Sequence, residues 1–437
     1  FNSGSSDYLN RTPGSAGNRK TYTLSWWMKI ASIGTDRNII QIQVDSNNRF
    51  NITLADSDKL AFQDVSSGTR YGHLTTSLFR DPSAWYHFVI SVDTTQSTDS
   101  NRYKIYANNV EQGLSAIVAG YPPQNHDTLL NSTNETLIGK VAGGSSDLNG
   151  YIAEMVLIDG QALDPTSFGE FDEDSPTIWK PIDVSGLTFG TNGFYLDFEN
   201  SGSLGADVSG NGNNFTVNNL TSIDQTTDTC TNNFATLNPL DLNTSASYSF
   251  SEGNVKTANT NFTRSTFANS SGKWYVESKC VSNTCWNGVR IIGSDVENEW
   301  TANSVALFIG GANLYIGGSN QGSGGYGSSW SANDIMMMAL DLDSGTQKIY
   351  FGKNGGWWNG SDYSAGSPST GVTLTSGKTW QFQFGSGSGT STQEVNFGNP
   401  SFTISSGNSD GNGYGNFEYA VPSGYYALNT KNLAEFG

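Results

Sequence analysis

Two segments far apart in the chain share one pattern of apolar and polar positions. Residues 88–93 and residues 337–341 are apolar runs that end at an aspartate, and each is followed by a polar loop. The chain then returns through Lys-Ile-Tyr, at residues 104–106 in the first segment and 348–350 in the second. This pattern predicts two β-hairpins, each with one buried face, in which the isoleucine faces opposite to its Lys and Tyr neighbours.

Further alternating runs extend the same prediction along the chain. Residues 21–28 form one expected strand, and residues 39–44 and 49–54 form a hairpin around a polar turn. Residues 150–163 contain the last strand expected in the first domain. In a second set, residues 272–279 and 335–341 are the main strands, and the turn at 343–346 (Asp-Ser-Gly-Thr) predicts a glycine with positive φ.

Composition agrees with strands and restricts the partners. Of 437 residues 51 are glycine, and the helix-forming residue types are scarce, so the predicted class is all-β. The net charge is −18 with no cluster of Lys or Arg, which argues against binding nucleic acid or anionic membranes. No apolar stretch is long enough to insert in a membrane, and no signal peptide is evident. The chain opens at Phe1 inside an expected strand, so we expect a longer parent protein.

The order of these strands resembles the strand order in two known families of β-sandwich domain. The opening F-N-S-G-S-S-D-Y-L, S-W-W-M, W-Y-H-F-V-I-S-V-D and G-Y-I-A-E-M-V-L-I-D-G-Q-A-L together resemble a laminin-G-like domain over residues 1–168. K-W-Y-V-E and A-L-D-L-D-S-G-T with its return strand resemble a SPRY-like domain within residues 247–437. The resemblance implies two concanavalin A-like jelly-roll sandwiches. Residues 169–246 would form a packed, β-rich connector, because Phe194, Leu196, Phe198 and Phe215 need burial.

The pairing of these two domains also resembles structural proteins of marine tailed phages. It implies a virion surface protein, such as a tail fibre, appendage or head decoration, whose partners are other virion proteins and host-surface carbohydrate. A homotrimer is possible, because fibres are commonly trimeric, but no coiled-coil or collagen segment sets a stoichiometry. No cofactor is implied. The alternatives are a polysaccharide-degrading phage appendage and a secreted bacterial adhesin.

Catalytic and metal-binding residues are not assigned. The three histidines, His73, His87 and His126, lie in no known catalytic motif, and His87 is expected to be a packed strand residue. Two sets of acids have the spacing that a glycosidase uses, Asp341 with Asp343 and Glu170 with Asp172 and Asp174. The first set lies at a turn, and the second lies in an acidic loop next to proline, so we expect local hydrogen bonding and solvent exposure, respectively.

Cysteines and one aspartate loop leave two questions open. Cys230, Cys280 and Cys285 are too few for a disulfide framework, but Cys280 and Cys285 flank a short loop that a bridge could close. The loop at 207–213 (D-V-S-G-N-G-N) has too few carboxylates near Asp207 for a calcium site, so a solvated turn is favoured.

Aromatic residues in three polar loops are the predicted ligand-binding residues. Sugar rings stack on Trp and Tyr while neighbouring amides and hydroxyls bind the sugar oxygens. The candidates are Trp300, Tyr326, Trp330, Trp357, Trp358 and Tyr363. The competing interpretation is that large rings such as Trp330 and Trp357 cover the ends of the core. The sequence thus predicts a non-enzymatic glycan-binding protein whose second sandwich carries the site.

Overall fold

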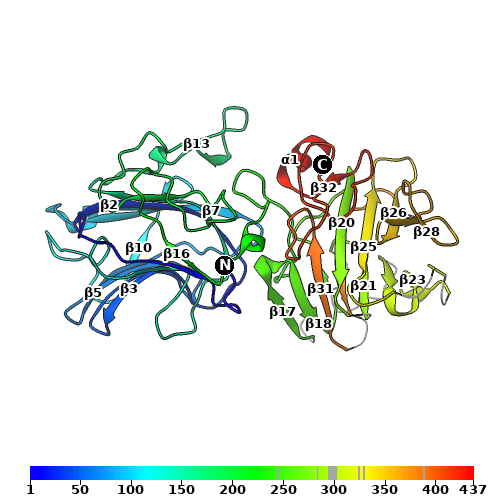
Figure 1. Cartoon of the computed structure of the whole chain (residues 1–437), viewed down its shortest axis with the longest axis horizontal. Coiled ribbons are helices and arrows are strands. Elements are labelled where there is room, and N and C mark those ends of the chain that lie inside the picture. The colour runs from blue at the N-terminus through cyan, green and yellow to red at the C-terminus, as the bar shows by residue number, and fades with distance from the viewer. Residues whose placement is uncertain (244–245, 283, 294–302, 323–324, 328–329, 387–388) are drawn as a thin grey trace. The chain divides into compact units, whose positions relative to one another are not determined.

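The fold is described from a computed structural model, over residues 1–243, 246–282, 284–293, 303–322, 325–327, 330–386 and 389–437. The chain divides into two compact units, Phe1–Gln225 and Thr226–Gly437. Residues 169–225 of the predicted connector thus belong to the first unit, and the remainder belongs to the second. Each unit is a β-sandwich whose described strands pair almost entirely antiparallel, and the described residues are all-β apart from short helical turns and one C-terminal helix (Figure 1).

In the first unit, eight described strands form a sheet that we call sheet A. In order of pairing they are β10 (Leu114–Ala116), β6 (Thr69–Thr75), β5 (Leu60–Ser66), β4 (Asn48–Leu54), β3 (Arg37–Asp45), β11 (Thr136–Ile138), β1 (Tyr8–Arg11) and β16 (Thr216–Asn218). The predicted hairpin of residues 39–54 is confirmed as β3 and β4, with Ile42 opposite Phe50.

The second layer of this unit is sheet B. Its six described strands are, in order, β15 (Phe194–Leu196), β12 (Gly150–Asp159), β2 (Thr21–Ile30), β7 (Trp85–Asp93), β8 (Tyr103–Ala107) and β9 (Val110–Glu111). Alternate residues of both sheets meet in one core, in which Trp26 and Phe88 of sheet B and Phe50 of sheet A are buried. The predicted hairpin of β7 and β8 is confirmed, with Ile90 opposite Ile105.

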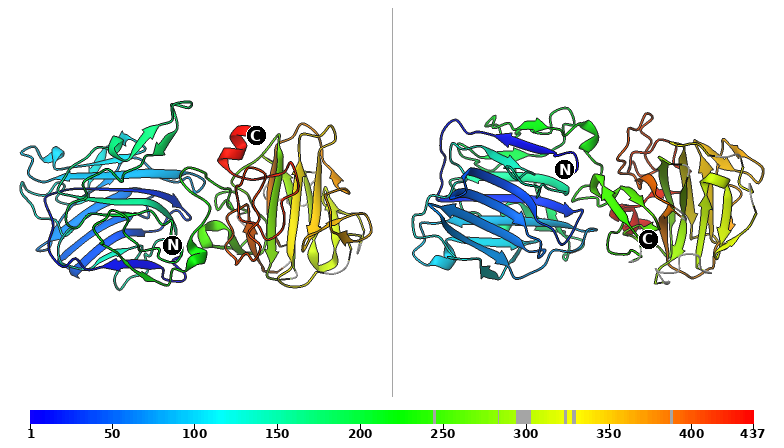
Figure 2. Two further views of the ribbon diagram at one scale, coloured as in Figure 1. Left: turned by 45° about the horizontal axis from the view of Figure 1, so that its top comes forward. Right: turned by 90° about the horizontal axis from the view of Figure 1, so that it is seen from below.

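The segment after residue 168 packs on this sandwich. Phe194, Leu196 and Phe215 are buried in the first core and Phe198 packs against it, so the expectation that these residues need burial is confirmed. The outer face of sheet B is covered by a separate two-stranded arm, β13 (Gly169–Phe171) and β14 (Trp179–Pro181), together with neighbouring loops (Figure 1). The outer face of sheet A is seen face on in Figure 2, right.

In the second unit, ten described strands form sheet C. In order they are β17 (Tyr248–Ser251), β18 (Lys256–Asn259), β31 (Ser391–Asn396), β20 (Lys273–Cys280), β25 (Ile335–Asp341), β26 (Lys348–Lys353), β27 (Gly356–Trp358) and β28 (Tyr363–Ser364), while β29 (Val372–Thr373) pairs with β26 and β32 (Tyr426–Ala427) pairs with β20. The predicted hairpin of β25 and β26 is confirmed, with Leu340 opposite Ile349.

Sheet D faces sheet C across the second core. Its six described strands are, in order, β19 (Thr263–Arg264), β30 (Trp380–Ser386), β21 (Cys285–Ile291), β22 (Ser304–Phe308), β23 (Asn313–Ile316) and β24 (Ser319–Asn320). Trp274 and Met338 of sheet C and Phe382 of sheet D lie in this core. The C-terminal segment covers the other face of sheet C, where Phe417 packs with Tyr275.

The turn between β25 and β26 differs from the prediction. Gly345 does not have the positive φ that was expected of it. The Asp341 carboxylate instead accepts the Asp343 and Ser344 N–H groups, at 3.2 and 3.0 Å, and so fixes the start of a longer loop. This side-chain bonding replaces the tight glycine turn.

Helical segments are few among the described residues. They are η1 (Asp99–Asn101), η2 (Pro165–Ser167), η3 (Ser222–Asp224), η4 (Glu252–Asn254), η5 (Ile309–Gly311) and α1 (Thr430–Phe436). In the described part of the chain, none of them has the length and apolar character needed to cross a membrane.

Candidate functional site

A polar groove of about 320 Å³ lies on the outer face of sheet A. Because side chains alternate along a strand, Ile42 and Phe50 point into the core while their neighbours, such as Gln41 and Asn51, point to the outer face. A register shift between Asn38 and Ile40 turns Asn38 outward on the same face as Gln41. The strand side chains that line the groove include Asn38, Gln41, Gln43, Arg49, Asn51 and Thr53.

Hydrogen bonds hold the groove side chains in place. Gln41 Nε2 donates to Asn51 Oδ1 at 2.9 Å across the β3–β4 pair. Thr53 Oγ1 donates to Asn38 Oδ1 at 3.1 Å, and Asn38 Nδ2 donates to the Lys140 carbonyl at 2.8 Å. The floor of the groove is therefore preorganised, since the amides of Asn38, Gln41 and Asn51 are each fixed by a partner on another strand or loop.

One wall of the groove comes from the loop that follows β11. Val141 and Ser146 of this loop line the groove, and the Ala142 N–H donates to Gln41 Oε1 at 2.5 Å. The site is therefore a strand-floored groove with a loop along one side. Fixed amide and hydroxyl groups in such a groove suit a ligand that presents many oxygen atoms, as carbohydrates do.

The aromatic residues predicted to bind ligand are not exposed platforms. Tyr326, Trp330, Trp357 and Trp358 expose 8, 4, 3 and 6% of their surface, and Tyr363 is half-buried. The expectation of exposed rings is therefore wrong for these residues. Trp300 lies outside the described residues.

These rings pack on one another and on the core. Tyr326 stacks on Trp358 with ring centroids 4.9 Å apart, and Tyr363 contacts both Trp358 and Trp330. Trp357 instead lies on the opposite face of sheet C, near Tyr275. Large apolar rings in loops gain more free energy by covering the core than by facing water, which is the competing interpretation considered above. Ligand binding by these residues stays a prediction.

The first pair of acids has structural contacts. Asp341 forms an ion pair with Lys273 at 2.9 Å and accepts a hydrogen bond from Ser344 Oγ at 2.7 Å. Hydrogen bonds from Lys273 and Ser344 outweigh burial and lower the pKa of Asp341. Asp343 Oδ1 accepts the Gly272 N–H at 2.7 Å. The prediction of local hydrogen bonding at this turn is confirmed.

The second set of acids lies on the β13–β14 arm. Glu170 and Asp174 are exposed, as expected for this acidic loop. Asp172 accepts hydrogen bonds from the Asp174 and Ser175 N–H groups, each at 3.0 Å, and pairs with Lys180 at 3.2 Å. These contacts organise the tip of the arm.

His87 is buried between two tryptophans and bonded at both ring nitrogens. Trp179 Nε1 donates to His87 Nδ1 at 2.9 Å, and His87 Nε2 lies 2.8 Å from Ser25 Oγ. An indole N–H can only donate, so Nδ1 is the acceptor and Nε2 carries the proton of the neutral ring. A base that activates serine must accept a proton at that nitrogen, so the Ser25–His87 pair is not arranged for nucleophilic catalysis. Burial also lowers the pKa of His87 to about 3.

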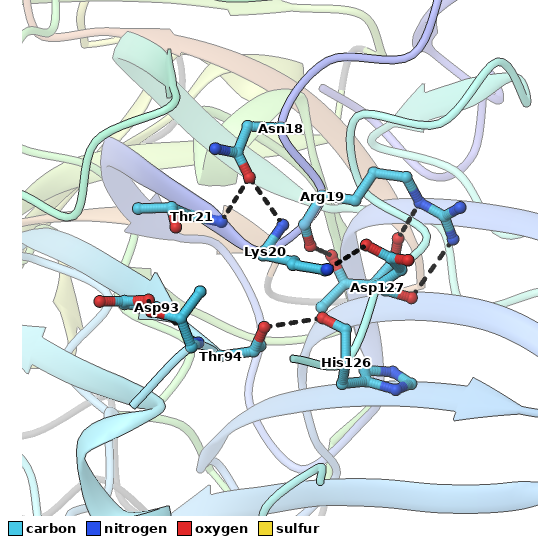
Figure 3. Close-up of polar contacts among 10 residues, drawn as sticks. Asn18, Arg19, Lys20, Thr21, Asp93, Thr94, His126 and Asp127 are labelled. Carbon is cyan, nitrogen blue, oxygen red and sulfur yellow. Dashed lines mark hydrogen bonds and ion pairs between the residues drawn. The ribbon is translucent and has the colours of Figure 1, made fainter. Parts of the chain in front are cut away.

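The other two histidines make structural contacts. His126 Nε2 lies 2.6 Å from Asp64 Oδ2. The segment around His126 is fixed at the end of the sandwich, where Thr94 Oγ1 donates to the His126 carbonyl at 2.7 Å and Lys20 lies 4.0 Å from Asp127 (Figure 3). His73 Nδ1 is hydrogen-bonded to the Tyr103 hydroxyl.

The aspartate loop and the cysteines have local partners. The Asp207 carboxylate accepts the N–H groups of Tyr195, Ser209 and Asn213 at 2.7 to 2.9 Å, so it organises its own turn. Cys280 and Cys285 are both buried free thiols. Burial, followed by the neighbouring Cys285, raises the pKa of the Cys280 thiol. In the described residues, no three His, Cys, Asp or Glu side chains converge as metal ligands.

The groove residues were not among the predicted site residues. They lie in the hairpin that was predicted, on the face of β3 and β4 that points away from the core. The available signal was the concentration of Asn, Gln and Thr at these alternate positions, in place of the charged side chains common on exposed strands.

Sequence comparison identifies the fold of the first unit. Residues 3–167 match the family described as the concanavalin A-like lectin/glucanases superfamily, of laminin G type. This part of the chain has a concanavalin A-like sandwich fold. No curated protein sequence matches the chain.

Solved structures with similar folds include sandwiches of several kinds. The TRIM65 PSpry domain is 15% identical, over 37% of this chain and 88% of that one, with a TM-score of 0.28. Domain 4 of AbnA, a GH43 extracellular arabinanase from Geobacillus stearothermophilus in complex with arabinotriose, is 22% identical over 36% and 68%, with a TM-score of 0.28. Domains LG4-5 of the mouse laminin α1 chain are 10% identical over 86% and 78%, with a TM-score of 0.30. At these scores the similarities carry no functional argument.

Proposed function

We propose that the first unit is a carbohydrate-binding domain and that the groove on sheet A holds the ligand. The observation that carries this proposal is the set of fixed amide and hydroxyl side chains along β3 and β4, in a groove large enough for sugar rings. The superfamily that residues 3–167 match is named for lectins and glucanases, which is consistent with a sugar ligand.

We also propose that this binding is not coupled to catalysis. The support is that Asp341, Asp343 and Asp172 have structural hydrogen-bond or ion-pair partners. The Ser25–His87 pair has the wrong tautomer for a nucleophile and base. The release of reducing sugar from a bound polysaccharide would contradict this part of the proposal.

A glycan array tests the binding proposal. The double variant Gln43→Ala/Asn51→Ala removes two groove amides, and we expect binding to weaken about thirtyfold and the array signal to fall accordingly, because each lost hydrogen bond to a ligand weakens binding by about 1 kcal/mol. The matched control Gln124→Ala removes an exposed amide elsewhere in the same unit and should leave the signal unchanged. Equal signals for the wild-type protein and the double variant would place the ligand elsewhere.

The biological setting is proposed from the sequence resemblance. We propose a tailed-phage virion protein that is exposed on the particle and contacts other virion proteins and host-surface glycan. Its support is the order of laminin-G-like and SPRY-like motifs in one chain. Antibody labelling of intact particles should detect the protein on the tail or head surface. Mass spectra of purified particles that lack its peptides would overturn this setting.

A further inference from the structure

Two arginines lie beside the groove on the same face of sheet A. Arg49 of β4 and Arg70 of β6 both pair with Val65 of the strand between them, so the three residues share one level of the sheet. Two strand spacings put their Cα atoms about 10 Å apart. Arg49 lines the groove itself, and Arg70 extends the same surface by two strands.

No carboxylate of the described residues forms an ion pair with either arginine. The nearest acids have other partners. Asp64 of β5 points inward to His126, and the Asp45 carboxylate accepts the Asn47 N–H at 2.7 Å. Asp36 lines the groove, and its carboxylate accepts the Asp56 N–H at 2.8 Å. Arg49 and Arg70 thus have no carboxylate partner, although the net charge of the chain is −18.

Four side-chain acceptor atoms of this surface are already used. Asn51 Oδ1 accepts from Gln41, Gln63 Oε1 accepts from Arg70 Nε at 2.8 Å, and Asn38 Oδ1 accepts from Thr53. Gln41 Oε1 accepts a backbone N–H of the neighbouring loop. Among these side chains and Arg70, the atoms left to face a ligand are mainly donors, namely the amide groups of Asn51 and Gln63 and the Nη groups of Arg70.

A donor-rich surface with two guanidinium groups, whose bonded partners are the Ser46 carbonyl and the Gln63 side chain and not carboxylates, favours a ligand that supplies charged acceptors. Neutral sugar hydroxyls both donate and accept, so they leave the excess of donors unmatched. Carboxylate and sulfate groups only accept, and guanidinium binds them with strong, paired hydrogen bonds. Burial, with a smaller effect from the Arg49 charge, lowers the pKa of Arg70, which is consistent with two cations held near each other.

We propose that the ligand of this groove is an acidic polysaccharide whose carboxylate or sulfate groups are bound by Arg49 and Arg70. This inference rests on the proposed carbohydrate-binding function and narrows it to a class of glycan. Neutral glycans would contact only the amides of the groove floor, so we expect them to bind more weakly.

Three matched oligosaccharides test the inference by calorimetric titration of the full chain. They are a galacturonate hexasaccharide, its carboxyl-reduced neutral form, and a sulfated derivative of that neutral form. We expect at least one charged form to bind about tenfold or more tightly than the neutral form. The ratio of the two charged forms distinguishes carboxylate from sulfate.

Variants separate the arginines from overall charge. The change Arg49→Gln/Arg70→Gln should remove the preference for the charged forms, whereas Lys378→Gln/Lys431→Gln, which removes the same charge from exposed positions of the second unit, should keep it. If the arginine variant does not fold, the salt dependence of binding by the wild-type protein tests the same point. Binding of the charged forms should weaken as salt rises from about 20 to 300 mM, and binding of the neutral form should not.

The outcomes distinguish the two proposals. Equal affinity for charged and neutral forms, lowered by Asn51→Ala, would overturn the acidic-ligand inference and leave carbohydrate binding in place. Loss of the preference in the lysine variant as well as the arginine variant would show nonspecific attraction and would also overturn it. An absence of binding to all three oligosaccharides, together with a blank glycan array, would overturn both.

Discussion

Replacing Glu277 by alanine is expected to destabilise the second unit by about 4 kcal/mol, because buried donors left without an acceptor cost about 1 kcal/mol or more each. Glu277 is fully buried on β20 and accepts four hydrogen bonds. The donors are the Tyr275 hydroxyl, the Asn396 side-chain amide and the backbone N–H groups of Glu418 and Tyr419, at 2.8 to 3.2 Å. The last two tie the C-terminal segment to sheet C.

The measurement is urea unfolding, with hydrogen exchange at the Glu418 and Tyr419 amides as a local probe. Exchange at both amides should accelerate in the alanine variant. The control Asp362→Ala removes an exposed acid of the same unit and should change stability by less than about 0.5 kcal/mol. Unchanged exchange at Glu418 and Tyr419 would show that the carboxylate does not hold the C-terminal segment.

The same residue gives a pH dependence with a definite sign. Burial raises the pKa of Glu277 to about 7, even though its four hydrogen bonds favour the charged form. The folded state therefore binds a proton that the unfolded chain releases near its ordinary pKa of about 4.5. The stability that this proton contributes is fully present below pH of about 4.5 and is lost as the pH rises through about 7. Glu277→Gln should flatten this part of the stability curve.

Replacing Trp26 by alanine is expected to cost about 3 to 5 kcal/mol, as large-to-small changes of fully buried aromatic residues do. Trp26 of β2 has no exposed surface and lies in the core between sheets A and B, with its ring centroid 5.5 Å from that of Phe88. The alanine leaves a cavity that the two sheets close only in part, because both are fixed by their strand pairing.

Thermal and urea unfolding measure this loss in the first unit. Val118→Ala is the matched control, because Val118 is 69% exposed and its truncation should shift stability by less than about 0.5 kcal/mol. A loss below about 1 kcal/mol in Trp26→Ala would mean that this ring is not part of a close-packed core.

Much of the fold was predictable because a strand has a two-residue period. The sequence predicted the β7–β8 hairpin and an Ile105 that faces opposite to Lys104 and Tyr106, and Ile105 is buried in the core. The expectation of one buried face is wrong for β7, because Val89 is buried on the outer face of sheet B under the segment after residue 168. The turn at Gly345 was not predictable in the same way. Its conformation depends on the Asp341 carboxylate, which bonds to residues two and three positions later, and on Leu342, which bonds to Gly272.

The candidate site was predictable only in part. The aromatic loops were selected because Trp and Tyr suit sugar rings, but sequence does not reveal whether a loop ring turns to solvent or onto the core, as Tyr326 and Trp358 do. The groove depends on a loop after residue 138 that packs beside β3, a contact about a hundred residues distant in sequence. The amide side chains along β3 and β4 form a groove only because the loop after β11 lies beside them.

A crystal structure with an acidic or neutral oligosaccharide selected on the array tests the central proposal most directly. We predict ligand density on the outer face of sheet A, over β3 and β4, with sugar oxygens or acidic groups within hydrogen-bonding distance of Asn51 and Arg49. Density at the cluster of Tyr326, Trp330 and Tyr363 instead, with the groove empty, would contradict the assignment of the binding site to the first unit.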